Sequence, residues 1–146
     1  MAREAAVAMA YHLLDLAERK GKKYHRPFVA AADAFVACGS HANILRETLT
    51  YFRIAGDCYS TAKKHAQAAQ AYVKAQMFTE AVLQYRDAHL MDEAVSILKA
   101  HEIYVEKEVA KRIKNTARYT YLNEQKLECV PNMHITLYRV LMFASF

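Results

Sequence analysis

Two groups of basic residues have the type and spacing best suited to a binding chemistry. The first group is Arg19, Lys20, Lys22 and Lys23, with Arg26 close behind. The second group is Lys107, Lys111, Lys114 and Arg118. Residues at i, i+4, i+7 and i+11 share one face of a helix, so the second group predicts a basic stripe that could bind nucleic-acid phosphates or an acidic partner. The alternative is a solvated helix face whose charge Glu106 and Glu108 balance.

Histidine and cysteine are poorly arranged for metal binding or nucleophilic catalysis. The histidines form no His-Glu-x-x-His motif and no Cys/His cluster, and the cysteines form no Cys-x-x-Cys pair. His41 follows Cys38 across a Gly-Ser pair, which is not the spacing of a catalytic dyad. The glycines are isolated, so a phosphate-binding loop cannot form. We therefore expect no enzyme activity, no metal site and no cofactor.

The composition is that of a helical globular protein. Of 146 residues, 54% are hydrophobic and 24% are charged, and only three glycines and two prolines could interrupt helices. A net charge of +5 permits an acidic partner, nucleic acid included. The odd number of scattered cysteines favours a reducing compartment. Charges at Arg3, Glu4 and Asp15 exclude a secretory signal, and no apolar run is long enough to span a bilayer, so we expect a cytoplasmic or nuclear protein without a membrane partner.

A repeat of thirteen residues runs from about residue 55 to 101. One position of the repeat holds Ala55, Ala68, Ala81 and Ala94. The position four residues later holds Tyr59, Tyr72, Tyr85 and Leu98. Small and large residues at this spacing share one helical face, which lets neighbouring helices pack closely. The repeat therefore predicts stacked units of about ten helical residues and a turn of about three, each stabilised by the next.

Further helices are predicted on both sides of the repeat. Their ranges are 2–20, 28–38, 42–54 and 105–122. Gly21 and the basic residues after it are expected to end the first helix, and Gly39 and Ser40 the second. In the last helix, Val109, Ile113 and Ala117 are spaced to face the core, so the basic stripe should face away from it. The chain should contain seven to nine antiparallel helices and little sheet.

The chain changes character after about residue 128. The sequence Cys-Val-Pro-Asn at 129–132 should break the last helix, and a mostly apolar stretch follows. This stretch could close the fold as a strand or helix, or it could be foreign to the fold, and we favour the second interpretation. The helical repeat domain is therefore predicted to span 1–128, with 129–146 as a divergent apolar tail.

Four segments of the repeat resemble a known class of helical protein. They are 55–59 (Ala-Gly-Asp-Cys-Tyr), 68–72 (Ala-Ala-Gln-Ala-Tyr), 77–81 (Met-Phe-Thr-Glu-Ala) and 91–95 (Met-Asp-Glu-Ala-Val). They resemble a TPR-like right-handed α-solenoid of short antiparallel hairpins. More narrowly, they are similar to the helical repeat region of UvrD-like helicases and of TPR-and-ankyrin-repeat-containing proteins of the fungal type. Intraflagellar-transport and vesicle-coat solenoids use similar units. The resemblance covers about 1–128 and implies a fragment of a larger protein.

Two functions from different classes follow as expectations. The first is a non-catalytic protein-interaction scaffold, because solenoids present an extended surface to peptides or helices. The second, implied by the resemblance, is an accessory nucleic-acid-binding arm of a UvrD-like ATP-dependent helicase whose motor lies elsewhere. A protein or peptide partner is the leading expectation, nucleic acid is the alternative, and no small-molecule substrate is expected.

Overall fold

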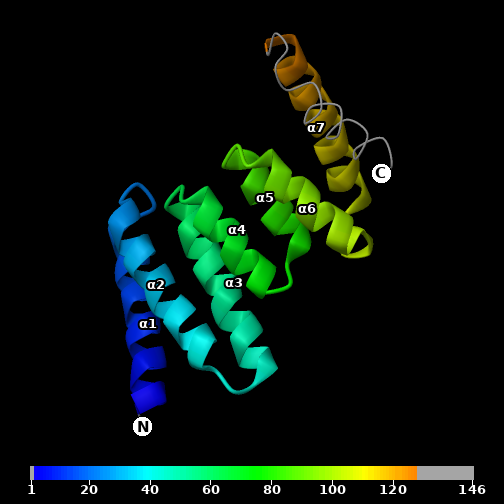
Figure 1. The fold of residues 1–146 in the computed structure, drawn as a ribbon. Coiled ribbons are helices and arrows are strands. Elements are labelled where there is room, and N and C mark those ends of the chain that lie inside the picture. Colours follow the sequence, from blue (N-terminus) through cyan, green and yellow to red (C-terminus); the bar gives the residue numbers. More distant parts are fainter. Residues whose placement is uncertain (1, 128–146) are drawn as a thin grey trace.

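The computed structural model describes residues 2–127, and every regular element in that range is helical. Seven α-helices follow one another in Figure 1: α1 (Ala2–Lys20), α2 (His25–His41), α3 (Leu45–Thr61), α4 (His65–Lys74), α5 (Phe78–Asp87), α6 (Met91–His101) and α7 (Lys107–Leu127). A short 3-10 turn, η1 (Glu102–Tyr104), precedes α7. The all-α prediction is confirmed for these residues, whereas the predicted tail, 129–146, lies outside them.

The helices are arranged in chain order. Each α-helix packs against the next one along the chain, and successive helices alternate in direction, as Figure 1 shows. The helix α5 also contacts α7. Within residues 2–127, no helix has both the length and the apolar character needed to cross a membrane.

The thirteen-residue sequence repeat coincides with a backbone turn that recurs every thirteen residues. The residues that follow α3, α4 and α5 by two positions all have φ near +60°, and they are Lys63 (61°), Gln76 (59°) and His89 (60°). In each turn the next backbone N–H donates to a tyrosine carbonyl at 2.9 Å, and the pairs are Lys64 to Tyr59, Met77 to Tyr72 and Leu90 to Tyr85. This bonding pattern is the Schellman motif, which satisfies carbonyls at a helix end. The residue that donates also precedes the next helix, so the predicted unit of ten helical residues and three turn residues is confirmed for α4 and α5.

Several predicted helix boundaries are wrong. The last helix, predicted as 105–122, runs from Lys107 to Leu127. The second helix does not stop at Gly39 and Ser40 but continues to His41. Gly39 is buried against the ring of Phe52, and a Cβ on this residue would meet the ring at 2.9 Å, so this glycine permits a close helix contact. The predicted helix 42–54 in fact runs from Leu45 to Thr61, because no turn separates it from the first repeat unit. The predicted first helix, 2–20, and its end at Gly21 are confirmed.

The repeated small and large residues lie where the helices pack. Seven of them are buried: Ala55, Tyr59, Ala68, Tyr72, Ala81, Ala94 and Leu98. Tyr85 is only half-buried. The Tyr72 hydroxyl donates to Asp57 Oδ1 at 2.6 Å, and the Tyr59 hydroxyl donates to Asp33 Oδ1. A buried phenol needs such a partner, so these bonds fix each ring across a helix interface.

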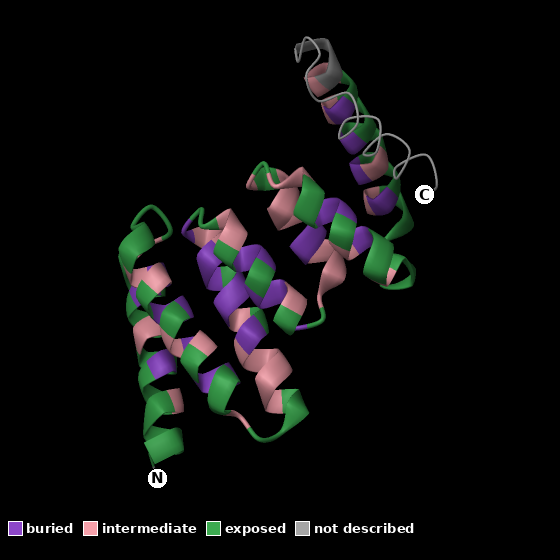
Figure 2. Ribbon diagram, in the orientation of Figure 1, coloured by how far each residue is buried: buried purple, intermediate pink, exposed green. Residues whose placement is uncertain are grey.

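The buried side chains form two main clusters. The first joins α1 to α4 and includes Ala81 of α5, and the ring of its fully buried Phe35 meets Tyr11 edge-on at 5.0 Å between centroids. The second joins α5 to α7 and is aliphatic, with Val82, Leu98 and Ile113 fully buried. Buried positions recur along α3, α4 and α7 in Figure 2, whereas α1 is exposed over much of its length.

Candidate functional site

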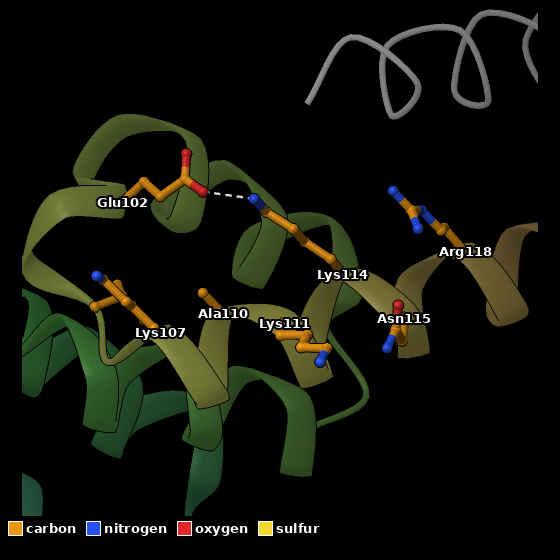
Figure 3. Close-up of a pocket in the computed structure, with 8 residues that line it drawn as sticks. Glu102, Lys107, Ala110, Lys111, Lys114, Asn115 and Arg118 are labelled. Atoms are coloured by element: carbon orange, nitrogen blue, oxygen red, sulfur yellow. Dashed lines mark hydrogen bonds and ion pairs between the residues drawn. The ribbon is translucent and has the colours of Figure 1, made fainter.

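The four cations of the predicted stripe line one groove beside α7, drawn in Figure 3. The groove encloses about 410 Å³ between α7 and the turn that precedes it. Its charged and polar lining residues are Lys107, Lys111, Lys114, Arg118, Glu102 and Asn115. The spacing that predicted a common helix face therefore brings these side chains to a common opening.

The opposite side of α7 holds the helix in place. Ile113 and Ala117 are buried in the clusters that α7 shares with α5 and α6, whereas the buried Ala110 also lines the groove. The Glu106 N–H donates to Thr79 Oγ1 at 3.0 Å near the start of the helix. Further along, the Tyr121 hydroxyl donates to Asp92 Oδ1 at 2.6 Å, so Tyr121 is a buried anchor. The groove thus sits on a helix fixed at two points.

The expectation that all four cations face away from the core is wrong for Lys114. Its side chain is only 22% exposed, and its Nζ lies 2.5 Å from Glu102 Oε1. Lys114 follows Ile113 in sequence and so turns partly toward the packed side, where the 3-10 turn carries Glu102 to it. This ion pair neutralises part of the stripe, whereas Lys107, Lys111 and Arg118 are exposed.

The residues of the first basic group lie in different surroundings in the structure. Arg19 pairs with Asp15 at 2.9 Å on an exposed face, and such pairs contribute little to binding or stability. The Lys23 ammonium lies 5.2 Å from the centre of the Tyr24 ring. Lys20 is exposed, and Lys22 lines a separate groove of about 450 Å³ with Phe28 and Cys58. None of these residues lines the groove beside α7.

Sequence reasoning missed a second basic groove, between α2 and the turn that joins α3 to α4. It encloses about 650 Å³, and its charged walls carry Arg26, Lys63 and Lys64. Val29 and Ala30 contribute an apolar surface, and Asp33 contributes one carboxylate. The Lys63-Lys64 pair at a turn was a visible signal in the sequence. Its proximity to Arg26 depends on how α3 packs against α2, which no local pattern records.

The two described thiols are buried and poorly suited to nucleophilic chemistry. Burial, helped by the charge of Asp57, raises the pKa of Cys58 to about 12. Burial also raises the pKa of Cys38 above its ordinary value. A raised pKa disfavours the thiolate that would attack a substrate, so both cysteines serve as small packing residues. Among residues 2–127, no group of three histidine, cysteine or acidic side chains could hold a metal ion.

No protein-family model, no curated protein and no solved structure matches this chain. Its function must therefore be inferred from the repeating turns and the two basic grooves.

Proposed function

We propose that this chain is a non-catalytic module of a TPR-like, right-handed α-solenoid that binds another protein. The supporting observation is the turn geometry, which recurs after α3, α4 and α5 with φ values within 2° of one another. Identical turns orient successive helices in the same way, so each unit depends on its neighbours rather than on a single central core. A stack of this kind presents a long surface, and such surfaces bind peptides or helices.

The solenoid can be tested by duplicating two whole units, residues 65–90, directly after Leu90. A stack with nearest-neighbour packing should accept the insert, because each new helix meets the same kind of interface. We expect far-UV circular dichroism to gain the signal of two ten-residue helices, with a thermal midpoint no lower than that of the original chain. Duplication of 65–85 is the control, because it breaks the thirteen-residue register. Equal loss of folding in both proteins would contradict the solenoid.

The scaffold function can be tested by photo-crosslinking in cells. Gln70 and Ser96 are both exposed and stand two units apart, so they should lie on the same face of successive hairpins. A photoreactive amino acid at either position should capture the same protein, and the purified protein should then bind the chain saturably. Ser40, exposed near the end of α2, is the control position. The scaffold is contradicted when Gln70 and Ser96 share no partner.

A second candidate is an accessory nucleic-acid-binding arm of a UvrD-like ATP-dependent helicase. The groove beside α7 supports it, because three exposed cations line one side of a helix. Phosphate contacts of this kind require no base recognition. Each neutralised phosphate releases counterions, so about three contacts should give a log-log salt dependence with a slope of about −2 to −3.

The second candidate is tested with a fluorescent poly-dT oligonucleotide at low salt. Reversing Lys107 and Lys111 to Glu should weaken binding and flatten the salt dependence for all sequences alike. Reversing Arg3 and Arg46 to Glu changes the net charge by the same amount and serves as the matched control, because both are exposed and belong to neither basic group. Equal weakening in both double variants would show attraction to overall charge alone. Undiminished binding after reversal of Lys107 and Lys111 would exclude the α7 groove.

A further inference from the structure

We infer that the groove between α2 and the α3–α4 turn binds an acidic peptide segment of a partner protein. This inference rests on the proposed scaffold function and adds the chemistry of the partner and the place where it docks. Arg26 comes from the first turn of α2, and Lys63 and Lys64 come from the turn after α3, so the packing of α2 against α3 creates the groove.

The charge of the groove favours an anionic ligand. Three cations face a single carboxylate, that of Asp33, and one oxygen of this carboxylate already accepts the Tyr59 hydroxyl. Within residues 2–127, none of the three cations takes part in an ion pair. The stripe beside α7 differs, because Lys114 is held there by Glu102. Carboxylates of a partner could therefore pair with Arg26, Lys63 and Lys64 without first breaking an internal ion pair.

The remaining lining residues favour a peptide over a nucleic-acid backbone. Val29 and the exposed Ala30 provide an apolar surface on which a small aliphatic side chain can rest. The second oxygen of Asp33 can accept a hydrogen bond from a peptide N–H, whereas a phosphodiester has no donor to offer. A segment that alternates acidic and aliphatic residues meets all three features.

The test uses the full chain and a fluorescein-labelled peptide of three Glu-Glu-Leu repeats, followed by fluorescence anisotropy. Reversing Lys63 and Lys64 to Glu should weaken binding about tenfold or more, because two contacts are replaced by repulsions. Reversing Arg3 and Arg46 to Glu is the matched control, because both are exposed and neither lines a groove described above. Both double variants lower the net charge from +5 to +1, so binding by overall charge would fall equally in both. We expect the control to stay within about twofold of the original affinity.

Further measurements make each outcome decisive. A peptide of three Gln-Gln-Leu repeats should bind about tenfold more weakly, since it keeps only the apolar contacts. Arg26→Glu, on a different element, should reproduce the loss and covers the case in which the lysine variant fails to fold. The inference is overturned by no binding of the acidic peptide, by equal losses in both double variants, or by poly-dT that binds through Lys63 and Lys64. In the first two cases a partner captured at Gln70 and Ser96 would still support the scaffold, so the two failures are distinguishable.

Discussion

The two packed regions of the chain, α1–α4 and α5–α7, are built by different means. In the first region, aromatic rings press against helix backbone: Phe52 lies on Gly39, and Tyr72 lies on Gly56. Buried tyrosine hydroxyls then bond to Asp33 and Asp57. In the second region the buried residues of the main cluster are aliphatic, although the ring of Phe78 stacks on His101. Its last helix is also tied by polar contacts, including those between Tyr121 and Asp92 and between Lys114 and Glu102.

This difference follows one position of the thirteen-residue repeat. The position of Gly56 is taken by Ala69, Val82 and Val95 in the following units. Where it is glycine, the ring of Tyr72 packs directly on the backbone and only 5% of the residue remains exposed. Tyr85 is less deeply buried than Tyr72 and makes no comparable hydrogen bond within the described residues. The same repeat thus holds two kinds of interface, one with a glycine against the tyrosine ring and one with alanine at the corresponding position.

The largest expected effect comes from Gly56→Ala. The new Cβ would lie 2.7 Å from two ring carbons of Tyr72, so the helices must separate or the ring must leave its site. We expect the free energy of unfolding to fall by about 1–3 kcal/mol in urea denaturation. In a Tyr72→Leu background the same change should cost much less, because the flat ring is gone. Equal costs in the two backgrounds would show that ring contact does not set the spacing of α3 and α4.

The second largest effect is expected from alkaline pH, which should lower the folding stability of the first region. Burial, and then the bonds to Asp33 and Asp57, raise the pKa of Tyr59 and of Tyr72 above the ordinary value of 10. An unfolded tyrosine ionises near pH 10 and the folded one does not, so the stabilisation is complete below pH 10 and is lost as the pH rises above it.

The loss should be on the order of 1 kcal/mol for each tyrosine by pH 11. Urea denaturation between pH 8 and pH 11 measures it. The double variant Tyr59→Phe, Tyr72→Phe has no hydroxyl to ionise at these positions and should show a flatter dependence on pH. A dependence as steep as that of the original chain would assign the alkaline effect to other groups.

In the second region, Tyr121→Phe should loosen α7 without disturbing α1–α4. The change removes the hydrogen bond to Asp92 and should cost about 1 kcal/mol. Amide hydrogen exchange should speed up in α7 while α2 and α3 keep their protection, because a helix opens locally when one of its own anchoring bonds is removed. Tyr119→Phe, at a residue that is 68% exposed, is the control and should change nothing. Faster exchange throughout the chain would show that both regions unfold as one unit.

The sequence was informative where the physics is local. Periodicity within one helix found α1, the units α4 and α5, and the basic stripe on α7. It failed where two distant segments meet. The helix α3 continues through Ala55 because no turn geometry interrupts it, and Gly39 stays helical because Phe52 packs on it.

The polar contacts of the candidate sites could not be predicted from local sequence patterns either, because they also join segments that are distant in the chain. The tyrosine–aspartate pairs are separated by 26, 15 and 29 residues, so no fixed spacing identifies the partner of a given tyrosine. The ion pair of Lys114 depends on a 3-10 turn that has no clear sequence signal, and the groove of Arg26 and Lys63 depends on how two helices pack.

The smallest expected effect concerns Gln76, in the turn that joins the two regions. Its φ of +59° is unfavourable for a residue with a side chain, and glycine adopts it freely. Gln76→Gly should therefore raise the free energy of unfolding by about 0.5–1 kcal/mol, less than the full strain because glycine loses more chain entropy on folding. Gln70→Gly is the matched control. It makes the same chemical change at an exposed position inside α4 and should cost about 0.5–1 kcal/mol instead.

The part of the chain in which Gln76→Gly slows hydrogen exchange shows how the two regions are coupled. If the turn couples α1–α4 to α5–α7, Gln76→Gly should slow hydrogen exchange in both regions, because the geometry of the turn fixes α5 against α4. Slower exchange in α5–α7 alone would mean that the second region opens independently of the first and that the turn stabilises only the second region. A loss of stability in Gln76→Gly would contradict the assigned backbone strain.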